Sequence, residues 1–179
     1  ELPGGQVNIL TVARFGREKG IPRAVEAFGM MENVSAPWHY YVVGDGLERP
    51  LVEEAIRKYH LEERVTLLGE MENPYGYMKA ADLLLLPSYS EAAPMVIGEA
   101  ACLGTPVVTT RTTSSRDMVE EAGLGWVCPN SREGLTETLE ELLRCPEPRK
   151  QKKVQLLERT FDDAAACAQF GQLLTAQQA

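Results

Sequence analysis

The sequence predicts an α/β protein with a Rossmann-like, doubly wound parallel sheet of about six strands, helices on both faces and a helical C-terminal tail. Short apolar runs alternate with helical patterns from about residue 7 to residue 128, as they do in successive βαβ units. The predicted strands are almost continuously apolar, which indicates burial on both faces of the sheet. Only helical patterns follow residue 128, and 179 residues suffice for one domain with its own core.

Each strand is predicted from a short run rich in Val, Leu, Thr or aromatic residues. The six runs are 7–13, 38–43, 65–68, 82–86, 106–109 and 125–128. The loop 14–20 directly follows the first run, and the turn Gly44-Asp45-Gly46 follows the second. An open α/β sheet places its ligand crevice at this edge.

Proline and glycine positions predict where the helices begin and end. Pro50 is placed as a first-turn proline, and Asn73 is placed as the N-cap before Pro74. Gly104 is placed as a left-handed C-cap, and Pro106 then opens a strand. The predicted helices are 21–31, 48–59, 74–80, 95–103, 132–144, 148–159 and 162–176.

Composition narrows the class of partner. The chain has 18 Lys and Arg against 26 Asp and Glu, a net charge of −8, which argues against non-specific binding to nucleic acid or an anionic membrane. The longest apolar run, about 80–87, contains Asp82 and is too short to cross a bilayer. We therefore expect no transmembrane segment, and any anionic ligand must be held by locally placed cations.

The cysteines, the histidines and one basic run are expected to have structural rather than ligand-binding roles. The four cysteines lack a C-x-x-C pair and a nearby His, so we expect reduced thiols in a cytoplasmic protein and no metal site. Core packing explains Cys102 and Met118, and structural roles are expected for both histidines, at positions 39 and 60. The basic run 149–153 is expected to be a solvated helix face.

The loop 14–20 carries the first candidate site. Arg14 and Lys19 would lie at the carboxyl edge of the sheet, where they could pair with a diphosphate, Arg through a planar fork and Lys as a point charge. The spacing is not that of a Walker loop. Taken alone, the pattern also fits a solvated polar turn.

The second candidate is a pair of carboxylates, Glu91 and Glu99, separated by seven residues. Pro94 is expected to mark a helix start, which leaves Glu91 in the preceding loop and directs the N–H groups near Met95 and Val96 toward an anion. The carboxylates would accept hydrogen bonds from sugar hydroxyls. Two ordinary solvated glutamates are the alternative interpretation.

The order of these motifs resembles a known family. The landmarks are Ala13-Arg14 with Lys19-Gly20, the segment 43–46, the segment 64–69, Ala80-Ala81-Asp82, Leu86-Pro87-Ser88, Glu91 with Glu99-Ala100, and the segment 104–108. In this order, over about residues 8–161, the chain resembles retaining glycosyltransferases of the GT-B fold. Specifically, it is similar to the C-terminal, nucleotide-sugar-binding domain of glycosyltransferase family 4, also called group 1.

The resemblance implies a role for each matching residue. Arg14 and Lys19 would neutralise the donor diphosphate, Glu91 would bind donor-sugar hydroxyls, and Glu99 would hold the ribose. The catalytic residues implied are Arg14, Lys19 and Glu91; the donor-binding residues are these three with Met71 near the base, Met95 and Val96 through main-chain amides, and Glu99. Many relatives have Gly-Phe-Gly after the first Glu, where this chain has Ala-Ala-Pro at 92–94. Because Pro94 lacks a backbone donor, contacts with the sugar must differ in detail.

The implied activity is transfer of a hexose from a nucleotide diphosphate sugar to an acceptor hydroxyl, with retained anomeric configuration, in polysaccharide biosynthesis. No D-x-D occurs in the chain, so we expect metal-independent transfer without a cofactor and favour a UDP-sugar over a GDP-sugar as donor. Two alternatives stay open. A nucleotide-sugar epimerase of the same fold would lack the Glu-x₇-Glu signature, and a non-catalytic nucleotide- or sugar-binding module would tolerate changes at Glu91 and Glu99.

The resemblance also implies a domain division. We expect a linker remnant at 1–6, the nucleotide-sugar-binding domain at 7–160, and at 161–179 a helix that crosses back to an N-terminal domain not contained in this chain. The acceptor, a glycan or a lipid-linked sugar, would be bound through that missing domain. The fragment alone would then be inactive, and the whole enzyme would act in the cytoplasm or on its membrane face.

Overall fold

The structure, a computed structural model, describes residues 2–32, 34–92 and 94–159. Its centre is one six-stranded sheet in the order β3-β2-β1-β4-β5-β6, with every neighbouring pair parallel. The strands are β1 (Val7–Val12), β2 (Trp38–Val43), β3 (Val65–Gly69), β4 (Leu83–Leu86), β5 (Val107–Thr110) and β6 (Gly125–Cys128). The predicted fold class, a Rossmann-like α/β sheet, is confirmed.

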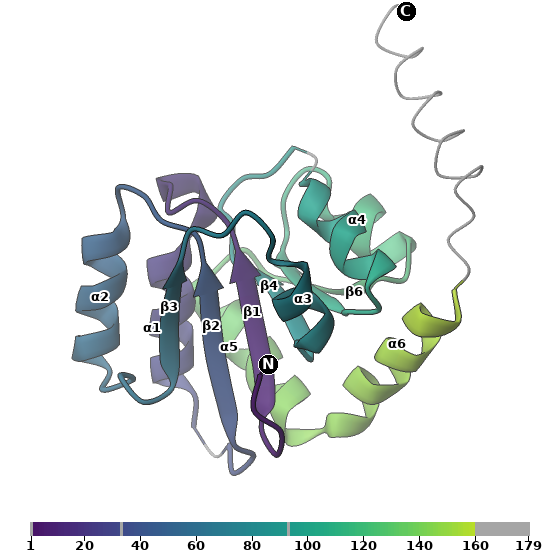
Figure 1. Ribbon diagram of the computed structural model, residues 1–179, viewed down its shortest axis with the longest axis horizontal. Coiled ribbons are helices and arrows are strands. Elements are labelled where there is room, and N and C mark those ends of the chain that lie inside the picture. Colours follow the sequence, from purple (N-terminus) through teal and green to yellow (C-terminus); the bar gives the residue numbers. More distant parts are fainter. Residues whose placement is uncertain (1, 33, 93, 160–179) are drawn as a thin grey trace, which may run out of the picture.

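Two layers of helices cover the sheet (Figure 1). The helices α1 (Ile21–Met30), α2 (Arg49–Lys58) and α5 (Arg132–Arg144) contribute to the core on one face of the sheet, and α3 (Tyr75–Ala80), α4 (Met95–Cys102) and α6 (Pro146–Glu158) to the core on the other. In Figure 1, α1 and α5 lie behind the sheet and α3 lies in front of it. A 3₁₀ turn at Arg17–Lys19 precedes α1, and a π-helix at Arg116–Glu121 precedes β6. Among the described residues, no helix has the length and apolar character needed to span a membrane.

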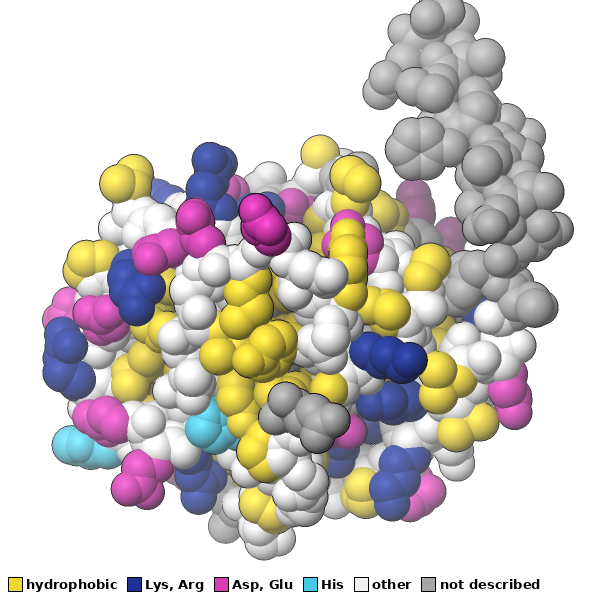
Figure 2. Space-filling view, viewed as in Figure 1, with side chains coloured by type: hydrophobic (Ala, Val, Ile, Leu, Met, Phe, Trp, Pro, Cys, Tyr) yellow, Lys and Arg dark blue, Asp and Glu magenta, His cyan; other side chains and the backbone are white. Residues whose placement is uncertain are grey.

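Alternating residues of the strands supply two separate cores. Ile9 of β1 packs in one cluster with Phe28 of α1 and Leu139 of α5, whereas its neighbour Leu10 packs in the other with Met78 of α3. This division explains why the strand sequences are apolar at nearly every position. Figure 2 shows hydrophobic side chains gathered at the centre of the face that Figure 1 presents, with charged side chains around them.

The structure corrects several predicted details. Helix α6 begins at Pro146, two residues earlier than expected, because prolines 146 and 148 both fit within a first turn. Cys102 is exposed rather than part of the core, whereas Met118 is half-buried against the second cluster. The predicted helix 162–176 and the predicted domain end at 161–179 lie outside the described residues.

The basic run 149–153 is not simply a solvated face, because three of its cations bind main-chain carbonyl groups. Arg149 is buried and donates its Nε–H to the oxygen of Leu142 at 2.6 Å. Lys152 and Lys153 donate to carbonyl oxygens on the segments before β6 and β4, at 3.3 and 2.8 Å. The run therefore fastens α6 to the rest of the domain.

The two histidines are both away from the carboxyl edge of the sheet. His39 lies in β2, stacks on Tyr41 with ring centroids 4.4 Å apart, and shares a 2.8 Å hydrogen bond with the Thr66 hydroxyl of β3. Burial lowers the pKa of the His39 imidazole. His60 follows α2 with a positive φ of 53°.

Candidate functional site

The loop after β1 is held against the turn after β2. Phe15 is fully buried; its N–H donates to the Asp45 oxygen at 2.8 Å, and its oxygen accepts from the Glu48 N–H at 3.0 Å. Gly44 has a φ of +128°, and a Cβ there would overlap the carbonyl oxygen of Ala13. The glycine is thus required by the close approach of the two backbones, and this contact sets the path of the chain into the Arg14–Gly20 loop.

The two predicted motifs meet in an ion pair. Lys19 Nζ lies 2.7 Å from Glu91 Oε1, and the Ser88 hydroxyl donates to the same oxygen at 2.7 Å. The Lys19 side chain is 25% exposed and that of Glu91 is 11% exposed. The Tyr89 N–H donates to the Glu18 oxygen at 2.8 Å, so the two loops are joined through their backbones as well.

Helix α4 begins at Met95, directly after Pro94, and Glu91 lies in the preceding loop, as expected. The first-turn N–H groups of α4, including those of Met95 and Val96, have no acceptor within the helix. They give this end of α4 a partial positive charge at the edge where β4 ends. On the second turn, Glu99 accepts a hydrogen bond from the Tyr75 hydroxyl of α3 at 3.3 Å.

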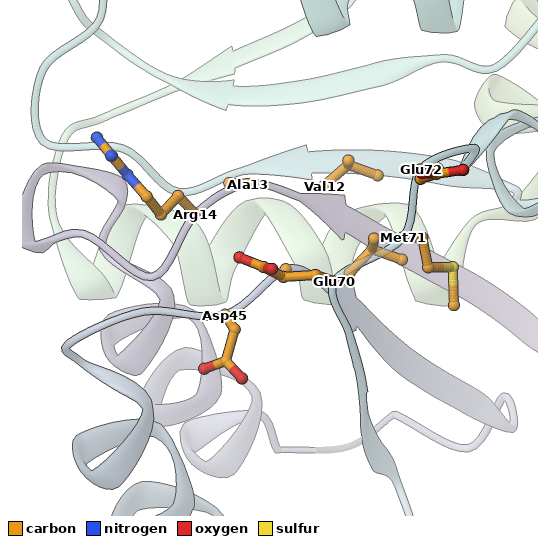
Figure 3. Close-up of a pocket in the computed structure, with 9 residues that line it drawn as sticks. Val12, Ala13, Arg14, Asp45, Glu70, Met71 and Glu72 are labelled. Atoms are coloured by element: carbon orange, nitrogen blue, oxygen red, sulfur yellow. The ribbon is translucent and has the colours of Figure 1, made fainter.

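A cavity of about 470 Å³ opens at the carboxyl ends of β1, β2 and β3. Figure 3 shows the side chains of Arg14, Asp45, Glu70 and Met71 around it, contributed by the segments that follow these three strands. Arg14 is exposed, and Asp45 is engaged by Arg49 of α2 at 2.9 Å. The carboxylates of the lining suit hydroxyl and amine donors better than a diphosphate, whereas Arg14, Lys19 and the start of α4 supply positive charge at the same edge.

The structure places the predicted residues in three groups along this edge. Arg14 and Met71 line the cavity, and Lys19 and Glu91 form the ion pair. Met95 and Val96 begin α4, and Glu99 lies on its second turn. In the described part of the chain, no three His, Cys, Asp or Glu side chains are grouped as metal ligands would be.

Sequence reasoning missed two residues that contact these loops, Arg23 and Asn130. Arg23 of α1 is 6% exposed, and its guanidinium lies 3.8 Å from the centroid of the Tyr89 ring. Asn130, just before α5, bonds both to Arg23 and to the backbone of Tyr89. No motif marks these residues in the sequence, since each belongs to an otherwise ordinary helical or loop segment.

Comparison with known proteins identifies the family. The family model described as "Glycosyl transferases group 1" matches residues 1–155. The chain belongs to the group 1 glycosyl transferases. This group 1 chain is 30% identical over 155 residues to the putative colanic acid biosynthesis glycosyltransferase WcaL of Salmonella typhimurium, covering 80% of this chain and 38% of WcaL.

Two further relatives also match this chain over part of their own length. The lipopolysaccharide glucosyltransferase WaaG of Escherichia coli is 35% identical over 133 residues, which are 72% of this chain and 35% of WaaG. Sucrose-phosphate synthase from Thermosynechococcus elongatus superimposes with a TM-score of 0.78 at 26% identity, over 98% of this chain and 46% of that one. This group 1 chain therefore spans less than half the length of each of these three relatives.

Proposed function

We propose that this chain is the donor-binding half of a retaining glycosyltransferase that moves a hexose from a nucleotide diphosphate sugar to an acceptor hydroxyl. The observation that carries the proposal is the contact between Lys19 and Glu91, residues 72 positions apart, at the edge where doubly wound folds bind ligands. A cation suited to a diphosphate and a carboxylate suited to sugar hydroxyls are thereby adjacent, as the two halves of a nucleotide sugar require.

The geometry supports a division of labour along the edge. The nucleoside would occupy the cavity beside Met71. The carboxylates that line this cavity can accept hydrogen bonds from donors of the ribose and the base, and Glu99 would hold the ribose. The diphosphate would lie against Arg14, Lys19 and the first-turn amides of Met95 and Val96. Glu91 would then bind hydroxyls of the sugar attached beyond the diphosphate.

The catalytic contribution follows from where charge develops. As the bond between the anomeric carbon and the diphosphate oxygen breaks, negative charge grows on the leaving diphosphate. Arg14, Lys19 and the α4 amides already lie at that edge, so they would stabilise the charge without reorganising. These cations and amides would replace the metal ion that a D-x-D enzyme uses, and we propose transfer without a metal or other cofactor.

The relatives are longer than this chain, and the part of them that this chain does not cover bears on its function. We propose that the acceptor, a glycan or lipid-linked sugar of polysaccharide biosynthesis, is bound by a domain outside this chain, and that this chain alone binds the donor without transferring the sugar. The protein that contains both domains would transfer the sugar with the same anomeric configuration as in the donor. NMR of the new glycosidic linkage measures this configuration.

Calorimetric titration with UDP, GDP and ADP, in buffer with EDTA, tests the donor site directly. We expect one nucleotide, UDP by preference, to bind, and Lys19→Met and Glu99→Gln each to weaken it by about tenfold. Arg144→Met is the matched control, because Arg144 is exposed at the end of α5 and pairs only within its own helix and with the Glu32 backbone among the described residues. Absence of binding by the wild-type chain, or equal weakening by the control, would contradict the proposal.

A further inference from the structure

Arg23 makes an unusual set of contacts for a residue on the first turns of α1. Its Nη2 donates to the Pro87 oxygen at 2.6 Å, and its Nη1 donates to Asn130 Oδ1 at 2.8 Å. Its Nε is buried without a hydrogen-bond partner among the described residues. Because burial of a guanidinium is unfavourable unless its donors are satisfied, burial lowers the pKa of Arg23. Packing alone would be served as well by an apolar side chain.

The contacts of Arg23 converge on the loop that follows β4. The guanidinium stacks on the Tyr89 ring at 3.8 Å and bonds to Pro87, two residues earlier. Asn130 extends the network, since its Nδ2 donates to the oxygens of Tyr89 and Arg111, each at 3.0 Å. The loops after β4, β5 and β6 are therefore tied together and to α1.

This network ends two residues before Glu91. Tyr89 is held on both sides, because its N–H also donates to the Glu18 oxygen at 2.8 Å. Gly20 contributes a third constraint: its φ is +62°, and a Cβ there would overlap the Pro87 oxygen. Segments 18–20 and 87–89 thus lie in direct contact, and the Lys19–Glu91 pair is a further contact between the same two loops.

We infer that Arg23 is a positioning residue for donor-sugar recognition: it fixes the loop after β4 so that Glu91 stays beside Lys19. The inference rests on the proposed function, and it assigns to Arg23 an effect on the sugar rather than on the nucleotide. Only an arginine fits the place, because its planar fork reaches a carbonyl and a side-chain amide together while its face covers an aromatic ring. A lysine could satisfy one of these contacts at a time.

The test compares Arg23→Met with wild type in two measurements. In the ligand-free chain, amide exchange of residues 88–91 is expected to become about tenfold faster, since the loop loses charge-assisted bonds, while amides of β1 and β4 stay unchanged. In calorimetry, affinity for UDP-glucose is expected to fall about tenfold and affinity for UDP to stay within about twofold. If the wild-type chain prefers GDP or ADP, that nucleotide and its glucose derivative replace the UDP pair.

Three further variants control the comparison. Compared with Arg23→Met, Arg23→Lys is expected to recover part of the lost sugar affinity. Asn130→Ala changes an exposed residue of the same network and is expected to have the same effects as Arg23→Met, so it provides the test if Arg23→Met does not fold. Arg144→Met removes an exposed arginine from the opposite edge and is expected to leave both measurements unchanged.

Each outcome bears on the inference. Unchanged exchange at 88–91 would overturn it, and so would equal weakening of UDP and UDP-glucose, which would indicate general loss of structure. If the wild-type chain binds no nucleotide, the proposed function fails first and the inference falls with it, whereas wild-type binding that Arg23→Met leaves unaltered would overturn the inference alone.

Discussion

The Lys19–Glu91 ion pair predicts opposite effects of one substitution on two ligands. In Glu91→Gln, Lys19 no longer faces a competing carboxylate, so a bare nucleoside diphosphate should bind more tightly. The side chains are 25% and 11% exposed, so solvent screens their attraction less than that of a fully exposed pair, which contributes about 0 to 1 kcal/mol, while desolvation offsets part of the gain. Taking about 1 kcal/mol, we expect UDP to bind about fivefold more tightly.

The same substitution should weaken the sugar derivative. A charged acceptor for sugar hydroxyls is lost, and such a hydrogen bond contributes about 1.5 to 3 kcal/mol. Even after the gain at Lys19, binding of UDP-glucose should fall relative to binding of UDP by about tenfold or more. The ratio of the two dissociation constants therefore reports the sugar contact, free of the general change in charge.

Calorimetry at two salt concentrations measures both effects. The tightening of UDP should shrink at high salt, because the pair is partly exposed and therefore screened. Glu18→Gln is the matched control, since it removes an exposed carboxylate from the same loop and should change the ratio little. A Glu91→Gln chain that binds UDP and UDP-glucose more weakly by the same factor would refute the reasoning.

Other perturbations test the fold around the site. Gly20→Ala should lower the free energy of unfolding by about 1 to 3 kcal/mol, because the residue has a positive φ and faces the Pro87 oxygen; urea unfolding measures this, and an unchanged midpoint would contradict the close approach. The pKa of His39 is lowered by burial, so its neutral form stabilises the fold at pH values above about 6.5, and this stability is lost as the pH falls through the lowered pKa. His39→Gln should therefore flatten the acid side of the plot of unfolding free energy against pH, and parallel plots for the wild type and the variant would exclude this role. Burial raises the pKa of the Cys128 thiol to about 11, so maleimide should modify it far more slowly than Cys102 and Cys145, which are exposed. Mass spectrometry of the digested chain measures the labelling of each, and equal labelling of these three would contradict the burial of Cys128.

Most of the fold could be predicted because its signals are local. A run such as 82–86 is apolar and short, and Gly104 with Pro106 separates a helix from the next strand without reference to the rest of the chain. Where the outcome depended on distant partners, prediction failed. Nothing near Lys153 in the sequence indicates that its side chain reaches the Ala81 oxygen, 72 positions away, and nothing near Cys102 indicates that its face of α4 is uncovered.

The candidate site divides in the same way. Arg14, Lys19, Glu91 and Glu99 could be selected because their order along the chain resembles a family, even though each spacing alone is weak. Arg23 could not, because its partners lie 64 and 107 positions away and its own surroundings are those of an ordinary helix start. Contacts of that range are set by the strand order, which no local pattern contains.

Strand order also explains why the ion pair forms at all. The chain places β1 between β2 and β4, and Ile9 of β1 is in register with Leu83 of β4. Because the strands are parallel, the loops that leave them emerge at the same edge, and this brings Lys19 to Glu91 across 72 positions. The two loops then run toward opposite layers, α1 on one face of the sheet and α4 on the other, so an extended ligand lying across the edge would meet cations from one loop and carboxylates from the other. A site built from the loops after β1 and β4 requires contacts that hold the two loops together. Arg23 belongs to α1 and bonds to the loop after β4, so it is placed to supply such a contact.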